Sequence, residues 1–326
     1  MGSLLSSVGR ERGRVVCAST FLLGGLVAAR ILRNRVSSRS NTVLVDAAHV
    51  DSSVSRIVRD GPDRLCVIMD FDRTITKYWD PSRTKRAPSS HGILERGRSA
   101  VFRAKADALT EFYFPIETDA SLSVTEKIPF MIDWYRKVHG LFVAEGLTRA
   151  DVANAASVSL SSVELRPGVV DTILWCERHR VPLIVMSAGL GDVITEVLRQ
   201  HLSNLPACLH VVSNAMEFDS SGALVAFTEP VMHMFNKRLQ ASDVERLAAA
   251  AGLRDSRRNF IIVGDSPGDA TMADGLDATT VLKIGLLNDA GNSAALLPRY
   301  RELFDVLLLG DTGLEPLVAI LESVAE

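Results

Sequence analysis

The stretch that decides the fold of this chain is Leu65-Cys66-Val67-Ile68-Met69-Asp70-Phe71-Asp72-Arg73-Thr74-Ile75-Thr76. Its apolar part has the length of a buried strand, and two carboxylates one residue apart follow it. Because side chains alternate along a strand, Asp70 and Asp72 should face the same way, with Phe71 packed on the opposite side. Two acidic groups held this close repel each other unless a cation, a shared proton or a substrate offsets the repulsion. The pair therefore indicates a catalytic site where the strand ends.

The composition is that of a globular protein with a real core. Apolar residues make up 47% of the 326 residues and charged residues 23%, which suits one large domain or a core with a sizeable insertion. The formal net charge is −3, so nothing favours a nucleic-acid polymer as partner, since such proteins usually show a basic excess. The four cysteines have no CxxC spacing and indicate buried small side chains in a reducing compartment.

The first 44 residues differ from the rest. An uncharged run, Val15–Ala29, is flanked by arginines on both sides. The run is shorter than the roughly 20 residues that span a bilayer, although a snorkelling Arg30 would extend the apolar segment to 15–32. This pattern suits either a membrane anchor, with the rest of the chain facing the cytoplasm, or a cleaved mitochondrial or other organellar targeting segment. The first six residues also fit the N-myristoylation pattern, so several fates of this segment stay open.

From residue 45 onward, short apolar runs alternate with helical patterns. The predicted strands are Leu65–Met69, Val181–Met186, Phe260–Val263 and Asp305–Leu309. The predicted helices between them are Gly168–Arg180, Gly191–Leu202 and Ala241–Ala251. This alternation predicts an α/β fold, an open sheet with helices on both faces. Ligands of such sheets bind beyond the carboxyl ends of the strands.

The first two predicted strands are separated by roughly a hundred residues, far more than one crossover needs. Helical patterns in Ile93–Glu111 and Thr125–Glu145 predict an inserted, mostly helical cap at 79–165. A decorative helical subdomain is the alternative, but the insertion leaves directly after the acidic pair, which favours a cap. We therefore expect an N-terminal segment at 1–44, a catalytic core at 45–78 and 166–326, and a cap between the two core parts.

Four loops at predicted strand ends carry complementary polar groups. After the acidic pair come Ser187-Ala188-Gly189, then Lys237, then Gly264-Asp265-Ser266-Pro267-Gly268-Asp269. Each piece alone has an ordinary explanation as a surface turn, a helix N-terminus or a solvated lysine. Together they supply a carboxylate nucleophile, a hydroxyl beside a glycine, a lysine and a second acidic pair. This set predicts phosphoryl transfer to an aspartate assisted by Mg²⁺.

The acidic residues have distinct expected roles. Asp70 would attack phosphorus, which divides one difficult hydrolysis into two easier steps. Asp72 would protonate the departing oxygen and then take a proton from the incoming water. Asp70, Asp265 and one backbone carbonyl, that of Asp72, would hold the Mg²⁺.

The remaining groups would bind the phosphate. Ser187 and the Ala188 amide would contact phosphate oxygens, and Gly189 would allow the backbone to approach closely. Lys237 would add positive charge on the transferring group. Asp269 and Ser266 are secondary candidates.

With these motifs in order, the chain resembles the haloacid dehalogenase superfamily of phosphohydrolases and, more closely, the cytosolic pyrimidine 5′-nucleotidase (type III) family. The closer resemblance runs from about residue 45 to the C-terminus. It is carried by Leu122-Ser123-Val124-Thr125-Glu126-Lys127-Ile128-Pro129-Phe130-Met131-Ile132-Asp133-Trp134-Tyr135, Phe235-Asn236-Lys237, Met272-Ala273-Asp274-Gly275 and Lys283-Ile284-Gly285-Leu286-Leu287-Asn288-Asp289. The resemblance implies a Rossmann-like three-layer core with a parallel sheet, a helical cap, and Mg²⁺-dependent hydrolysis of nucleoside 5′-monophosphates, typically UMP and CMP.

The resemblance also implies substrate-binding residues. Glu117 matches the cap carboxylate that such enzymes direct toward the base, where it accepts hydrogen bonds from amino groups; alone, it would be read as a solvated surface acid. Arg73 stands where relatives usually carry methionine or glycine, and the sequence does not decide whether it points away or pairs with an acid. Val138 replaces a small hydroxyl residue, which removes a hydrogen-bond partner worth about 1 kcal/mol and bears on base preference.

Two other functions stay open. The same core could act on another small phosphomonoester, such as phosphoserine or a sugar phosphate. A non-enzymatic, membrane-tethered nucleotide-binding protein is less favoured, because a decayed enzyme need not keep all of Asp70, Asp72, Lys237 and Asp265. The preferred base, ribose against deoxyribose, and the oligomeric state do not follow from the sequence.

Overall fold

The computed structural model describes residues 41–325 apart from 120, 203, 239–246, 248–256, 290 and 292. Most of the predicted N-terminal segment, including the apolar stretch 15–32, lies outside the described residues, and so does the predicted helix Ala241–Ala251 apart from Leu247. None of the helices in the described part of the chain combines the length and apolarity that a membrane span needs.

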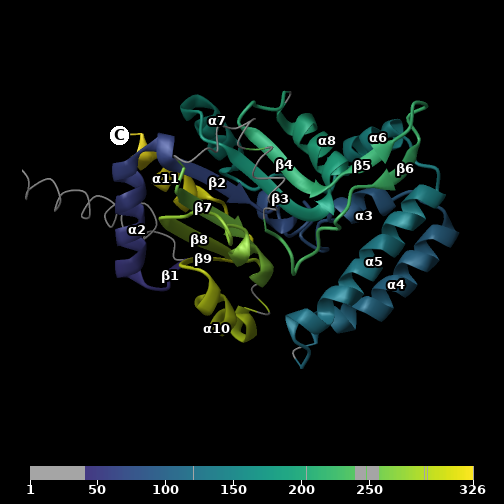
Figure 1. Ribbon diagram of the computed structural model, residues 1–326, viewed down its shortest axis with the longest axis horizontal. Coiled ribbons are helices and arrows are strands. Elements are labelled where there is room, and N and C mark those ends of the chain that lie inside the picture. Colours follow the sequence, from purple (N-terminus) through teal and green to yellow (C-terminus); the bar gives the residue numbers. More distant parts are fainter. Residues whose placement is uncertain are drawn as a thin grey trace, which may run out of the picture.

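The largest sheet among the described residues has seven strands in the order β1-β9-β8-β7-β2-β3-β4 (Figure 1). Neighbouring strands are parallel except β1 and β9. The strands are β1 (Thr42–Leu44), β2 (Leu65–Met69), β3 (Leu183–Leu190), β4 (Leu209–Asn214), β7 (Asn259–Gly264), β8 (Thr280–Leu287) and β9 (Val306–Leu309). From β2 the chain builds the sheet in one direction through β3 and β4, then in the other through β7, β8 and β9. This reversal places a ligand-binding crevice at the carboxyl end of β2.

The sheet is buried on both faces, which explains why β2 is apolar throughout. One face packs against four helices, α2 (Ala47–Asp60), α7 (Val169–His179), α8 (Gly191–Leu202) and α11 (Glu315–Val324). On this face lie Leu65, Val67 and Met69, whereas Cys66 and Ile68 face the opposite cluster, which contains Leu247. Helix α10 (Ser293–Leu303) packs beside β8 and β9. The expected α/β fold with a mainly parallel sheet is confirmed.

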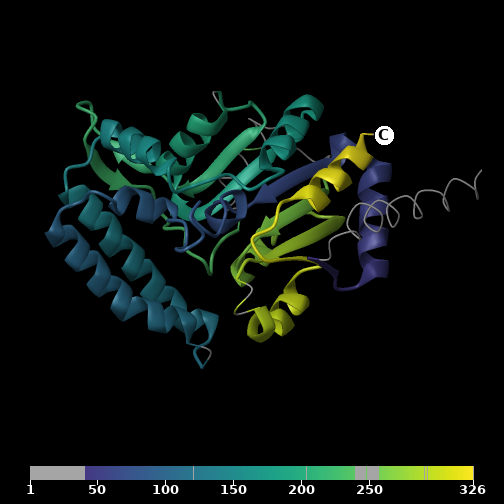
Figure 2. The same ribbon diagram turned by 180° about the vertical axis from the view of Figure 1, so that it is seen from behind.

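Four helices of the described chain lie between residues 79 and 165, and we call them the inserted helices: α3 (Ser90–Glu95), α4 (Ala100–Thr118), α5 (Val124–Ala144) and α6 (Arg149–Ser159). The expected helix over Ile93–Glu111 is wrong as one element, because the chain breaks at Gly97, which has φ +79°, and restarts where Ser99 caps α4. A separate hairpin of β5 (Met216–Phe218) and β6 (Leu224–Phe227) packs against α5. Figures 1 and 2 show α4 and α5 side by side, at the end of the molecule away from α2.

The stem of the insertion is fixed to the core. Thr76 and Leu165 pair in an antiparallel bridge, and the next residue, Arg166, donates its backbone N–H to the Ile75 carbonyl at 2.8 Å. The Arg166 side chain is fully buried and pairs with Asp311 at 3.1 Å. The two chain ends of the insertion therefore meet beside the turn that follows β2.

Candidate active site

The turn after β2 positions the predicted nucleophile. Asp70 donates its backbone N–H to the Val263 carbonyl at 2.9 Å, which joins the ends of β2 and β7. The chain then turns tightly over Phe71–Ile75, where Arg73 adopts the left-handed conformation with φ +65°. The Arg73 carbonyl accepts hydrogen bonds from the Arg166 guanidinium at 2.7 Å and from Asn288 Nδ2 at 3.0 Å. These buried donors hold the turn in a shape that non-glycine residues rarely adopt.

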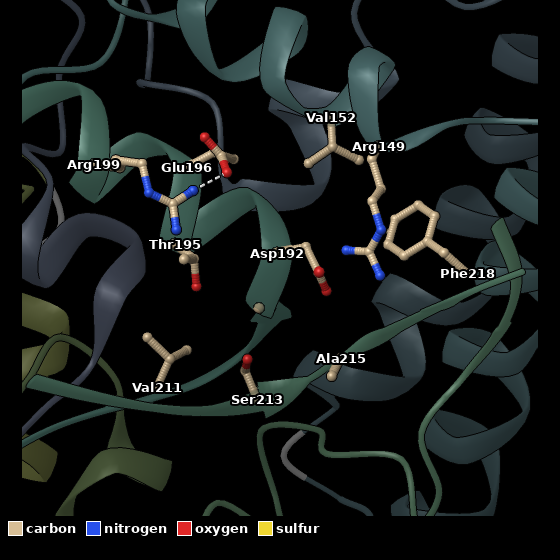
Figure 3. Close-up of a pocket in the computed structure, with 11 residues that line it drawn as sticks. Arg149, Val152, Asp192, Thr195, Glu196, Arg199, Val211, Ser213, Ala215 and Phe218 are labelled. Atoms are coloured by element: carbon tan, nitrogen blue, oxygen red, sulfur yellow. Dashed lines mark hydrogen bonds and ion pairs between the residues drawn. The ribbon is translucent and has the colours of Figure 1, made fainter. Parts of the chain in front are cut away.

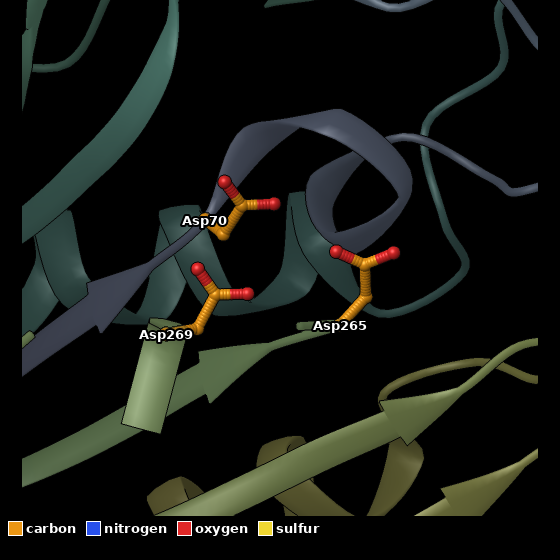
Figure 4. A group of neighbouring side chains, drawn as sticks. All are labelled: Asp70, Asp265 and Asp269. Carbon is orange, nitrogen blue, oxygen red and sulfur yellow. The ribbon is translucent and has the colours of Figure 1, made fainter. Parts of the chain in front are cut away.

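Three carboxylates converge beyond the ends of β2 and β7 (Figure 4). One oxygen from each of Asp70, Asp265 and Asp269 lies within 4.8 Å of the others. Lys237 Nζ donates to Asp70 Oδ1 at 2.5 Å and also to Asp269 Oδ1. Asp70, Asp269 and Lys237 are buried. Lys237 thus bonds two of the three carboxyl groups, so carboxyl groups outnumber the ammonium group in this cluster.

Asp269, a secondary candidate in the sequence, is fully engaged by the protein. Its second oxygen accepts hydrogen bonds from Ser266 N at 2.8 Å and Ser266 Oγ at 2.9 Å. A Cβ at position 264 would overlap the Asp269 side chain, so only glycine fits there. Ser266 therefore orients Asp269, and Asp269 in turn holds the Lys237 ammonium group beside Asp70.

The burial of this cluster changes its protonation. Burial raises the pKa of Asp70 well above its usual range, although Lys237 opposes the shift. Burial, together with Asp269, raises the pKa of Asp265 to about 7, and Arg73 opposes that shift. Burial alone would lower the pKa of Lys237, but Asp269 and Asp70 raise it above its ordinary value. A largely buried set of carboxylate oxygens that outnumber their ammonium partner fits a hard divalent cation such as Mg²⁺.

Asp72 lies apart from this cluster and bonds the first inserted helix. Its Oδ1 accepts a hydrogen bond from Ser90 N at 2.8 Å, and its Oδ2 accepts one from Ser90 Oγ at 3.0 Å. Burial raises the pKa of Asp72, and the Ser90 hydrogen bonds oppose the shift. Sequence reasoning missed Ser90, because nothing local separates it from the neighbouring Ser89 that caps α3.

The segment Ser187-Ala188-Gly189 lies in the irregular end of β3 and not, as expected, in a loop after the strand. Regular pairing with β4 ends at Met186, and the register shifts before Leu190. Ser187 is buried, and its Oγ accepts a hydrogen bond from Gly189 N at 3.0 Å. Asn214 Nδ2 donates to the Ala188 carbonyl at 2.8 Å. Asn214, also missed in the sequence, therefore fixes the backbone of the predicted phosphate-binding segment.

A cavity of about 310 Å³ opens between the turn after β2 and the inserted helices. Its lining includes Arg73, His91, Glu117, Trp134, Tyr135 and Val138. Burial raises the pKa of Glu117, while Lys127 and Arg73 oppose the shift. The sequence left the orientation of Arg73 open. In the structure its side chain faces this cavity, and its Nε is buried without a hydrogen-bond partner. No carboxylate of the described residues lies within 4.0 Å of its guanidinium group. The structure thus brings the predicted base-recognition residues to one space beside the turn.

A second cavity, of about 380 Å³, lies between α6, α8 and β4 (Figure 3). At its rim the Arg149 guanidinium stacks 4.2 Å from the centre of the Phe218 ring. None of the described residues that line this cavity is a predicted site residue. The acidic cluster and the cavity beside Glu117 therefore form the candidate active site.

Known proteins are similar to this chain in sequence and in fold. The family described as pyrimidine 5′-nucleotidase (UMPH-1) matches residues 73–325. The 7-methylguanosine phosphate-specific 5′-nucleotidase of Rattus norvegicus is 33% identical over 289 residues, covering 88% of this chain and 93% of the relative. The Gallus gallus enzyme of the same name is 34% identical over 290 residues, covering 88% and 97%.

A solved structure agrees with these sequence relatives. The crystal structure of cytosolic 5′-nucleotidase IIIB bound to cytidine superposes with a TM-score of 0.80 at 29% identity, and covers 90% of this chain and 97% of that one. The expected resemblance is confirmed along nearly the whole described chain. The chain belongs to the pyrimidine 5′-nucleotidase (UMPH-1) family of phosphoric monoester hydrolases.

Proposed function

We propose that this protein is a Mg²⁺-dependent 5′-nucleotidase that converts nucleoside 5′-monophosphates, UMP and CMP first among them, to nucleoside and phosphate. The observation that carries the proposal is the cluster of Asp70, Asp265 and Asp269, two of them buried and bonded to Lys237, beside a cavity that Glu117 helps to line. The relatives named as 7-methylguanosine phosphate-specific enzymes make the 5′-monophosphate of 7-methylguanosine the second candidate substrate.

The first chemical step uses two carboxyl groups. An Asp70 oxygen attacks phosphorus and forms an aspartyl-phosphate while the bond from phosphorus to the nucleoside O5′ breaks. Asp72 donates its proton to that leaving oxygen. The raised pKa of Asp72 suits this role, because burial keeps the carboxyl group protonated over a wider pH range.

The second step regenerates the enzyme. Asp72, now ionised, takes a proton from water as the water oxygen attacks phosphorus. The bond between phosphorus and the Asp70 oxygen breaks, and inorganic phosphate leaves. Asp70, Asp265 and the Asp72 carbonyl would hold Mg²⁺, which neutralises charge between the nucleophile and the dianionic phosphate.

The other predicted residues would bind and orient the substrate. Ser187 and the Ala188 amide donate hydrogen bonds to phosphate oxygens, and Asn214 holds that segment in place. Lys237 adds positive charge beside Asp70. Glu117 accepts hydrogen bonds from an exocyclic amino group of the base.

We further propose that the inserted helices, together with the β5–β6 hairpin, form the cap expected at 79–165. The cavity lined by Arg73 from the core and by Glu117, Tyr135 and Val138 from the inserted helices supports this division. The cap would exclude water from the reacting phosphate.

A substrate panel tests the proposal. Phosphate release is measured with UMP, CMP, GMP, 7-methyl-GMP, phosphoserine and a sugar phosphate, each with Mg²⁺ and with a chelator. We expect nucleotides to be turned over fastest, and activity to be lost with the chelator. Faster turnover of phosphoserine would refute the nucleotidase assignment, and nucleotide binding without any turnover would favour the non-enzymatic alternative.

A further inference from the structure

We propose that Ser90 is a positioning residue that aims the carboxyl group of Asp72 at the leaving oxygen. This inference rests on the proposed function, since it gives Asp72 a partner in its role as proton donor. Ser90 belongs to α3, the first inserted helix, and its side chain is fully buried.

The hydrogen bonds between the two residues fix both oxygens of the carboxyl group. Ser90 N donates to Asp72 Oδ1 at 2.8 Å, and Ser90 Oγ donates to Asp72 Oδ2 at 3.0 Å. Two donors from one residue, one on each oxygen, restrict rotation of the carboxyl group about its last torsion, which is otherwise broad. The Asp72 carboxyl group is thereby held in one orientation.

A third hydrogen bond connects Ser90 to β3. Leu190 N donates to Ser90 Oγ at 3.2 Å. The hydroxyl group thus accepts from the Leu190 N–H and donates to Asp72 Oδ2 at the same time. Ser90 therefore links the proton donor to the end of β3, which carries the predicted phosphate-binding segment.

The glycine of Ser187-Ala188-Gly189 makes room for this arrangement. A Cβ at position 189 would overlap Ser90 Oγ and would lie 3.2 Å from Asp72 Oδ2. Close approach of a phosphate explains a glycine here in general. In this chain the atom that requires the missing Cβ is the Ser90 hydroxyl.

The experiment compares a poor leaving group with a good one. Protonation by Asp72 matters for the strongly basic 5′-alkoxide of a nucleotide and little for the weakly basic nitrophenolate of p-nitrophenyl phosphate. In both cases kcat/KM reports the step that forms the aspartyl-phosphate. We expect Ser90→Ala to lower kcat/KM for UMP roughly 10- to 100-fold, part of what a positioned acid contributes, and to leave kcat/KM for p-nitrophenyl phosphate nearly unchanged.

Several variants keep the test decisive. Retained turnover of p-nitrophenyl phosphate shows that Ser90→Ala is folded. If that variant does not fold, Ser90→Cys takes its place, because a thiol fills the space of the hydroxyl group but is only a weak donor. Ser159→Ala is the matched control, because Ser159 is equally buried on an inserted helix but donates only to the Ala156 carbonyl at 2.7 Å. Its ratio of the two kcat/KM values should equal that of the wild type.

A double variant tests the coupling directly. In an Asp72→Asn background, Ser90→Ala should cause no further loss on UMP, because the group that it positions no longer donates a proton. An equal loss on both substrates, no loss on UMP, or an independent loss in the double variant would overturn the inference. If the wild type prefers phosphoserine to every nucleotide, the proposed nucleotidase function is wrong, but the role of Ser90 can still be tested. Phosphoserine then replaces UMP as the alkyl ester that is compared with p-nitrophenyl phosphate.

Discussion

Replacement of Lys237 with methionine removes the ammonium group that bonds both Asp70 and Asp269. The lysine and both partners are nearly or fully buried, and Asp265 adds a third carboxyl group within 4.8 Å of the other two. Removing one partner of a buried ion pair costs about 3–5 kcal/mol, because the other charge is left uncompensated. Here two carboxylates lose their partner at once. We expect the metal-free variant to unfold at a temperature at least about 6 °C lower than the wild type.

Mg²⁺ should reverse much of this loss. With the ammonium group gone, the three carboxylates attract a cation more strongly, and a ligand at 100 times its dissociation constant stabilises the folded state by about 2.7 kcal/mol. Thermal unfolding is therefore followed by circular dichroism with Mg²⁺ and with a chelator. The shift caused by Mg²⁺ should be larger for Lys237→Met than for the wild type.

Lys77→Met is the matched control for this prediction. Lys77 Nζ pairs with Glu164 at 2.7 Å in a half-exposed position, where such a pair is worth about 0–1 kcal/mol. The reasoning is refuted if Lys237→Met in chelator is as stable as Lys77→Met, or if Mg²⁺ shifts both variants equally.

Other consequences can be measured separately. Asp70→Asn should abolish phosphate release while the protein stays folded, because an amide is a poor nucleophile; substantial turnover would argue against a covalent intermediate. Glu117→Ala should weaken discrimination among nucleotides more than turnover of p-nitrophenyl phosphate, and an equal loss on both would give Glu117 a structural role. The Arg73 side chain faces the cavity and its Nε has no hydrogen-bond partner, so we expect it to donate to the substrate; Arg73→Met should then raise KM for nucleotides about 10-fold or more, whereas an unchanged KM would show that Arg73 does not bind substrate. Burial lowers the pKa of His139 from 6.5 to about 4, so its contribution to stability is complete above pH 6.5 and is lost as the pH falls toward 4, by up to about 1.4 kcal/mol per pH unit. In urea unfolding, the difference in free energy of unfolding between wild type and His139→Phe should therefore change with pH, and a difference that stays constant would contradict the linkage.

Asp70 and Asp265 were predictable because each follows a strong local signal. Asp70 follows an uninterrupted apolar run, and Asp265 follows a second run and a glycine. Buried parallel strands require such runs, and their ends meet at one edge of the sheet. The strand β2 agrees with its prediction at both ends.

The supporting residues were not predictable for an equally physical reason. Ser90, Asn214 and Arg166 act through partners that are distant in the sequence, and a serine or asparagine in a loop looks the same whether it is solvated or buried. The spacing of Asp269 from Asp265 did not show that Lys237 and Ser266 occupy its oxygens. Such contacts follow from tertiary packing and not from local pattern.

The stem of the insertion has a consequence for how substrate range can change. The Thr76–Leu165 bridge and the Arg166 side chain close the stem and at the same time hold the carbonyls of Arg73 and Thr74, at 2.7 and 2.9 Å. Whatever lies between residues 76 and 165 is therefore anchored by the same bonds that shape the turn after the nucleophile. Changes in the insertion that spare Ser90 should therefore leave the turn after Asp70 in place, whereas loss of Ser90 would also release the carboxyl group of Asp72. Substrate choice can vary along most of the insertion, but its first helix remains tied to the chemistry of bond breaking.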